Sequence, residues 1–114
     1  IMSVTTADRD LSLLHPVVRE AAERVVVRAN AEGLPFAVFE GWRSPARQNH
    51  LYAQGRTRPG PKVTFVRAWG SYHQYGLAVD LVLRTNGNWS WDASGANAAS
   101  WTRMHRIGEE EGLE

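Results

Sequence analysis

The stretch Ser-Tyr-His-Gln-Tyr-Gly-Leu-Ala-Val-Asp-Leu-Val-Leu, residues 71–83, decides the fold. From Leu77 to Leu83 every residue is apolar except Asp80, which predicts a buried strand with a carboxylate at its centre. An ionised carboxylate inside an apolar strand costs several kcal/mol unless it is paired, hydrogen-bonded or bound to a metal. Asp80 therefore needs a partner.

Two partners for Asp80 are visible in the sequence. His73 lies seven residues upstream, in a segment broken by Gly76. A loop histidine and a strand carboxylate can converge on one cation, and this pair is a common part of a catalytic zinc shell. Alternatively, Asp80 pairs with an arginine such as Arg43, and His73 is a surface or packed histidine. The residues taken alone leave both readings open.

The chain on either side of this stretch divides into further elements. Apolar periodicity, capping residues and turn residues predict each of them. The expected elements are a helix over 16–32, a strand over 35–41, a helix over 44–54, a long loop over 55–70, a hairpin turn over 85–88 and a last helix over 98–111. No repeat or linker separates them, so we predict one small α+β domain.

The composition excludes several classes of protein. The chain has 114 residues, of which 43% are hydrophobic and 22% charged, as expected for a single globular domain. Its 13 basic and 12 acidic residues give a net charge of +1, so we expect no nucleic-acid partner. The absence of cysteine excludes disulfides and thiolate metal sites. No apolar run is long enough for a membrane span, and no Sec-type signal is visible.

The motif Ser71-x-His73-x-x-Gly76-x-Ala78-x-Asp80 resembles the zinc signature of a family of peptidoglycan peptidases. That family includes phage L-alanyl-D-glutamate endopeptidases and vancomycin-resistance-type D,D-carboxypeptidases and dipeptidases. Upstream blocks resemble the endopeptidase branch in the same order: Gly41-Trp42-Arg43-Ser44 with Gln48, Leu51-Tyr52, Gly55-Arg56-Thr57, Pro59-Gly60 and Val63-Thr64. The resemblance implies the fold of Hedgehog and D,D-peptidase domains, a short antiparallel sheet packed by about three helices.

The resemblance also assigns the metal. It implies that His73 and Asp80 are two of three protein ligands to zinc. The family supplies the third ligand and the general base from a downstream Asp- or Glu-x-x-His motif, whereas this chain stops at Glu114. We therefore expect a single zinc peptidase domain over 1–114, truncated just short of that motif. His105, Glu40 and Glu114 are possible substitutes, but nothing in the sequence places them near the metal.

Three further side chains receive expected roles. By resemblance, Arg43 contacts the substrate or the charge that develops on the scissile carbonyl; the alternative is a structural ion pair with Asp80 or Glu40. Gln48 donates to substrate or is an ordinary exposed helix residue. Ser71 hydrogen-bonds substrate or steadies the loop that carries His73.

The implied function is a zinc-dependent peptidase that cleaves peptidoglycan stem peptides, with an L-alanyl-D-glutamate endopeptidase expected. A non-catalytic wall-binding module and a D,D-carboxypeptidase are the alternatives. We expect a monomeric bacterial or phage protein that acts on the cell wall. Without a visible Sec-type signal, the expected route is cytoplasmic synthesis followed by holin-dependent release or delivery by a phage particle.

Overall fold

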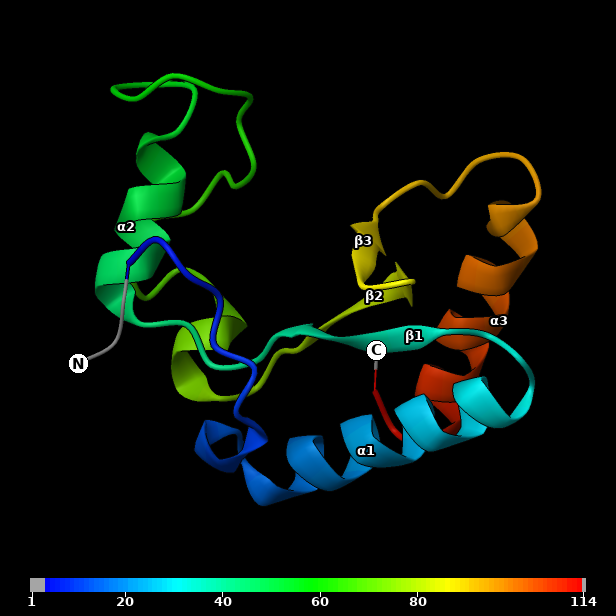
Figure 1. Ribbon diagram of the computed structural model, residues 1–114. Coiled ribbons are helices and arrows are strands. Elements are labelled where there is room, and N and C mark those ends of the chain that lie inside the picture. Colours follow the sequence, from blue (N-terminus) through cyan, green and yellow to red (C-terminus); the bar gives the residue numbers. More distant parts are fainter. Residues whose placement is uncertain (1–3, 114) are drawn as a thin grey trace.

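A three-stranded sheet with helices at both ends organises the computed structural model, which describes residues 4–113 (Figure 1). The elements in chain order are η1 (Leu11–Leu13), α1 (Pro16–Ala31), β1 (Phe36–Glu40), α2 (Pro45–Ala53), η2 (Tyr72–Tyr75), β2 (Asp80–Thr85), β3 (Asn88–Ser90) and α3 (Asn97–Glu110). This arrangement confirms the predicted α+β class. No helix in residues 4–113 combines the length and the apolarity needed to cross a membrane.

The sheet is antiparallel, in the order β1-β2-β3. Phe36 lies opposite Leu83, and Glu40 lies opposite Asp80 after a shift in register. The hairpin between β2 and β3 turns at Asn86 and Gly87, whose φ angles are 53° and 79°. Positive φ at both positions is typical of the tight turn that matches strand twist, so the predicted hairpin is confirmed.

The core forms where α1 and α3 pack together against the sheet. Val25 and Ala29 of α1 lie in one buried cluster with Phe36 of β1 and Ile107 of α3. Trp101 packs edge-on against Phe36, with ring centroids 5.1 Å apart. The apolar stripes that the sequence predicted for both helices are therefore the faces that the core buries.

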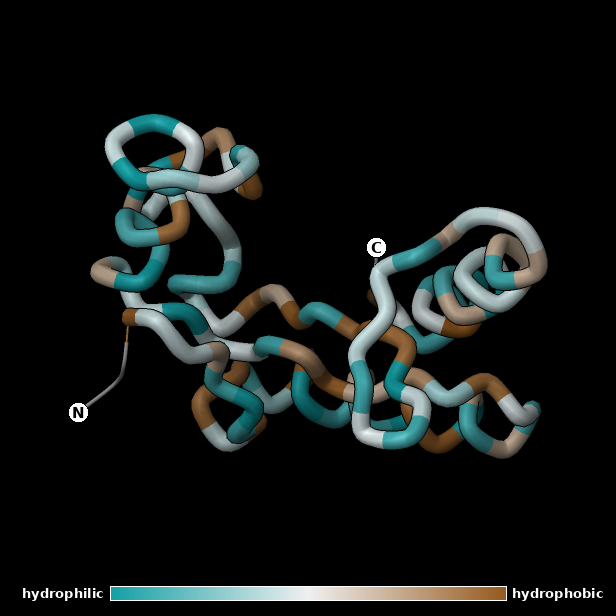
Figure 2. The backbone as a smooth tube through the Cα atoms, turned by 45° about the horizontal axis from the view of Figure 1, so that its top comes forward, coloured by the Kyte–Doolittle hydropathy of each residue, from teal (hydrophilic) through white to brown (hydrophobic). Residues whose placement is uncertain are grey.

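Helix α2 and the long loop after it, residues 45–70, form an arm at the opposite end of the sheet from α3 (Figure 1). Ser44 caps the helix, because its hydroxyl accepts a hydrogen bond from the backbone N–H of Arg47 at 3.0 Å. Figure 2 shows that the far end of the loop is mainly hydrophilic and that a hydrophobic stretch follows it on the side facing the rest of the molecule. The arm therefore has two chemically different sides.

The predicted central strand begins later than the sequence suggested. β2 starts at Asp80, and residues 77–79 precede it without a strand partner. The physical reason is that β1 ends at Glu40, directly opposite Asp80. The Asp80 side chain consequently stands at the start of the strand and is 32% exposed. The prediction of a carboxylate at the centre of a buried strand is wrong, so burial alone does not demand a cation beside Asp80.

Candidate metal centre

His73 and Asp80 come together, although one lies in η2 and the other at the start of β2. The Nε2 atom of His73 is 3.4 Å from Oδ1 of Asp80. Two ligand atoms that each lie about 2.0–2.2 Å from a tetrahedral zinc are separated by about 3.3–3.6 Å. The two atoms are therefore spaced as two corners of a zinc site.

The imidazole of His73 is oriented by a backbone carbonyl. Its Nδ1 atom lies 2.7 Å from the oxygen of Gly41. A carbonyl only accepts hydrogen bonds, so Nδ1 carries the hydrogen, and in the neutral ring the lone pair is on Nε2, facing Asp80. Such an outer partner is typical of a metal-binding histidine. Gly41 is held in turn, because its N–H donates to the carbonyl of Asp8 at 2.8 Å.

The loop that carries His73 is fixed by its own caps. The hydroxyl of Ser71 accepts from the N–H of His73, and the side chain of Gln74 accepts from the N–H of Ser71, both at 3.2 Å. Gly76 then turns the chain with a φ of 71°, and a Cβ there would lie 3.0 Å from the oxygen of Leu13. Ser71 thus steadies the loop, while its contact with substrate stays a prediction. The role of Gln74 was not predicted, although the Ser-x-x-Gln spacing is a capping signal.

Arg43 lies beside the pair, but neighbours within the chain hold its guanidinium group. One terminal nitrogen donates to Gln48 at 2.9 Å, and the other donates to Glu40 at 2.9 Å and lies 3.5 Å from Asp80. Its Nε atom is buried and has no hydrogen-bond partner in the described residues. The ion pairs considered as the alternative for Arg43 are therefore present, and its contact with substrate stays a prediction.

Gln48 is fully buried, in contrast to the expected exposed or substrate-facing position. Its amide oxygen accepts from Arg43 at 2.9 Å and from Gln74 at 3.2 Å. Its amide nitrogen donates to the hydroxyl of Thr64 at 3.1 Å and to the carbonyl of Val66 at 2.8 Å. These bonds use both donors of the amide, so Gln48 positions Arg43 against the arm and has no donor left for a substrate in this arrangement.

Glu40 is excluded as a free general base by its surroundings. It is 1% exposed and accepts hydrogen bonds from Arg47 and Arg43. Burial by itself raises the pKa of this carboxyl, but the hydrogen bonds from Arg47 and then Arg43 outweigh it, so the pKa lies below its ordinary value of 4.5. A carboxylate held ionised in this way is a weak proton acceptor. The other candidate, Glu114, lies outside the described residues.

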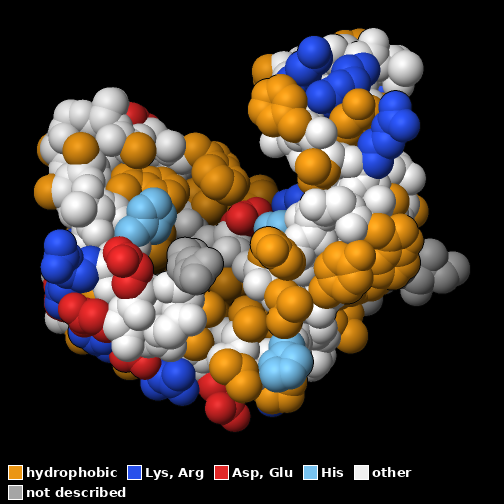
Figure 3. Space-filling view, turned by 180° about the vertical axis from the view of Figure 1, so that it is seen from behind, with side chains coloured by type: hydrophobic (Ala, Val, Ile, Leu, Met, Phe, Trp, Pro, Cys, Tyr) orange, Lys and Arg blue, Asp and Glu red, His pale blue; other side chains and the backbone are white. Residues whose placement is uncertain are grey.

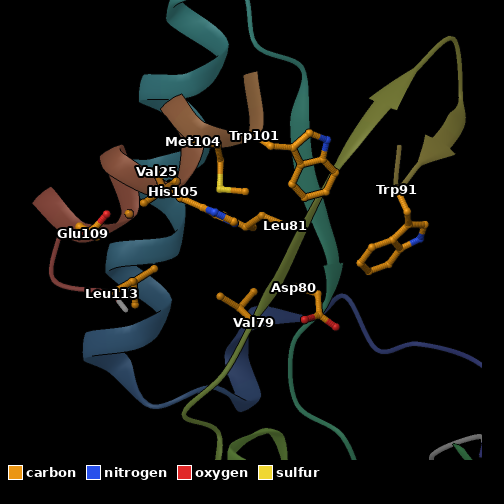
Figure 4. A pocket seen from close by; sticks show the side chains of 11 residues that line it. Val25, Val79, Asp80, Leu81, Trp91, Trp101, Met104, His105, Glu109 and Leu113 are labelled. Atoms are coloured by element: carbon orange, nitrogen blue, oxygen red, sulfur yellow. The ribbon is translucent and has the colours of Figure 1, made fainter. Parts of the chain in front are cut away.

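Two hollows meet at Asp80. One, of about 640 Å³, lies between the arm and the sheet and is lined by Arg43 and His73, among others. The second, of about 470 Å³, runs along α3, and Figure 4 shows Asp80 at one end of it. His105 lines only this second hollow. Within residues 4–113, no group of three or more His, Cys, Asp or Glu side chains is placed to hold a metal ion. The described residues thus bring together two candidate metal ligands, His73 and Asp80.

With this geometry in place, comparison with known proteins identifies the family. The chain belongs to the VanY D-alanyl-D-alanine carboxypeptidase family, whose model matches residues 11–114. Over 80 residues it is 42% identical to the peptidoglycan L-alanyl-D-glutamate endopeptidase CwlK of Bacillus subtilis (strain 168). That match covers 69% of this chain and 48% of CwlK, so the chain spans about half the length of this relative. The predicted family is confirmed.

Proposed function

We propose that the protein is a zinc-dependent peptidase that cleaves peptidoglycan stem peptides at the L-alanyl-D-glutamate bond. The observation that carries this proposal is the 3.4 Å separation of His73 Nε2 and Asp80 Oδ1. The carbonyl of Gly41 supports it by fixing the imidazole tautomer. The name of the relative CwlK supports the choice of bond.

The chemistry divides between the metal and the chain. Zinc bound here supplies a Lewis acid and lowers the pKa of a bound water to about 7. His73 and Asp80 hold it, and Arg43 provides a fixed positive charge 3.5 Å from Asp80 for a substrate carboxylate or oxyanion. A zinc peptidase also needs a third ligand and a proton acceptor. On this proposal both come from outside residues 4–113.

The proposal is tested with the variants His73→Ala and Asp80→Asn in the full-length protein. Loss of either ligand should lower zinc affinity by at least about tenfold and abolish cleavage of purified peptidoglycan. His105→Ala is the matched control, because this histidine borders the neighbouring hollow and should leave both properties unchanged. Zinc titration by calorimetry and mass spectrometry of released fragments provide the readouts. Wild-type cleavage by His73→Ala would refute the proposal.

A second candidate is a D,D-carboxypeptidase, which the description of the matching family favours. Both activities use the same metal chemistry and differ in which peptide bond of the substrate is placed at the metal. Incubation with a soluble stem pentapeptide separates them. Release of free D-alanine identifies the carboxypeptidase, whereas a product cut between L-alanine and D-glutamate identifies the endopeptidase.

The remaining alternative is a wall-binding module without turnover, whose binding needs no catalytic metal. Pull-down on purified peptidoglycan with and without a chelator tests it. Chelator-insensitive binding with no release of muropeptides supports the module and contradicts the peptidase.

A further inference from the structure

The charges of this chain are strongly segregated, although its net charge is only +1. No Asp or Glu occurs between Glu40 and Asp80, whereas residues 41–79 contain six Arg and Lys residues. This segment therefore carries +6, and the remaining residues together carry −5. The expectation of no nucleic-acid partner rests on the net charge, which conceals this segregation.

The cations concentrate at the end of the arm, where Figure 3 shows Lys and Arg side chains gathered over its tip. Arg43 and Arg47 already pair with carboxylates, because both contact Glu40 and Arg43 also lies 3.5 Å from Asp80. Four cations remain in the loop after α2: Arg56, Arg58, Lys62 and Arg67. In the part of the chain that the structure describes, none of these four pairs with a carboxylate.

The positive groups at the tip are close to one another. The guanidinium carbons of Arg56 and Arg67 lie 3.8 Å and 5.0 Å from the centre of the same Tyr52 ring. Burial, followed by the charge of Arg58, holds the pKa of His50 below its ordinary value. Like charges this close repel, and an anion bound among them removes the repulsion.

Two of the four cations, Arg56 and Arg58, also stabilise the loop. Arg56 donates to the carbonyl of Tyr52, and Arg58 donates to that of His50, each at 2.6 Å. Both bonds satisfy carbonyls near the C-terminal end of α2, a common role for arginine. Lys62 and Arg67 are exposed and lie outside these carbonyl bonds, which makes them the members of the cluster to test.

Apolar side chains accompany these cations: Phe65 is 80% exposed, and the guanidinium carbon of Arg56 lies 6.0 Å from the centre of its ring. A peripheral membrane site needs apolar groups and cations on one surface. Here Val63 lines the hollow that contains His73 and Asp80, and the hydrophobic stretch of the loop lies on the side facing the rest of the molecule (Figure 2). A bilayer is therefore the competing occupant, and the place on peptidoglycan that the proposed function gives the protein favours a hydrated linear polyanion of the wall.

We propose that the tip of the arm binds a linear phosphodiester polymer of the cell wall, next to the stem peptide in the adjoining hollow. This inference rests on the proposed function, which places the protein on peptidoglycan. Arginine matches phosphate oxygens with paired donors. Several cations spaced along one loop bind a flexible polyanion by releasing its counterions. The polymer thereby retains the protein on the wall between cleavage events.

The test uses purified sacculi that carry a polyol-phosphate polymer, and the same sacculi after cold hydrofluoric acid has removed the phosphodiesters. The full-length double variant Lys62→Gln/Arg67→Gln should bind intact sacculi about tenfold more weakly than the wild type. The slope of log affinity against log salt should fall by about 1.4 to 2 units, because two cations are removed. Arg19→Gln/Arg106→Gln changes the net charge equally on the far elements α1 and α3 and should bind like the wild type. Stripped sacculi should bind all three proteins weakly and equally.

Four results would overturn the inference: equal binding by the two double variants, undiminished wild-type binding to stripped sacculi, tighter binding to vesicles of anionic lipid, or tighter binding to DNA. Cleavage of a soluble, phosphate-free stem peptide separates this inference from the proposed function. Lys62→Gln/Arg67→Gln should cleave that peptide at the wild-type rate. If no protein cleaves it while phosphate-dependent binding persists, the peptidase proposal fails and the binding site stands.

Discussion

Replacing Glu40 by Gln should destabilise the protein more than any loss of an exposed ion pair. Glu40 is 1% exposed, and the side chains of its partners Arg43 and Arg47 are only 11% and 9% exposed. Glutamine keeps the shape but turns an NH₂ group toward two guanidinium groups and leaves their charges buried without a counterion. Removing one member of a buried ion pair costs about 3–5 kcal/mol, a large part of the stability of a small domain.

Urea unfolding followed by tryptophan fluorescence measures this loss. With a denaturant slope of about 1.5 kcal/mol per M, the midpoint should fall by about 2–3 M. Glu32→Gln is the matched control, because Glu32 pairs with Arg103 where both side chains are well exposed, at 40% and 36%. Its midpoint should hardly move. If Glu40→Gln unfolds at the same urea concentration as Glu32→Gln, the buried network does not stabilise the fold as argued.

Further outcomes follow from the same contacts. Because the pKa of Glu40 is lower in the folded protein than its ordinary 4.5, its stabilisation is present above that pH and is lost as the pH falls below it; acid unfolding of Glu40→Gln should be correspondingly less steep, and identical pH slopes would contradict this. Gln48→Leu should cost about 3 kcal/mol, because it leaves buried partners unpaired. It should also speed amide exchange at Val66, whose N–H donates to the Thr64 hydroxyl that Gln48 holds; unchanged exchange there would exclude the positioning role. Gly76→Ala should cost more than Gly87→Ala in thermal unfolding, because both have positive φ but only at Gly76 does a Cβ meet backbone atoms; equal costs would refute the close contact.

The sequence was sufficient for features that depend on local pattern. Residue type and spacing alone predict the apolar face of the last helix, which includes Ile107. They also predict the helix cap at Ser44 and the turn at Asn86. His73 and Asp80 were found through a motif, and the structure adds that their ligand atoms converge. The start of β2 was not predictable in this way, because it depends on where β1 ends.

The polar interior was the least predictable part of the site. Gln48 sits on a helix whose sequence gives no sign that its amide is buried, since burial depends on Thr64 and Val66 returning from a distant loop. Arg47 was missed for the same reason: its partner Glu40 lies in the preceding strand. The cationic arm, in contrast, is visible in the sequence as a long interval without any carboxylate, which a net-charge count conceals.

The bond from Gly41 to Asp8 has a practical consequence for anyone who handles this protein. The backbone of Gly41 connects the N-terminal segment, through its N–H, to the imidazole of His73, through its carbonyl oxygen. Trimming by proteases before residue 9, or a bulky fusion tag placed close to it, should therefore perturb a ring that is more than sixty positions away in the chain. Affinity tags should therefore be placed far from Asp8. The ring resonances of His73 in a nuclear magnetic resonance spectrum provide a direct check that the contact is intact.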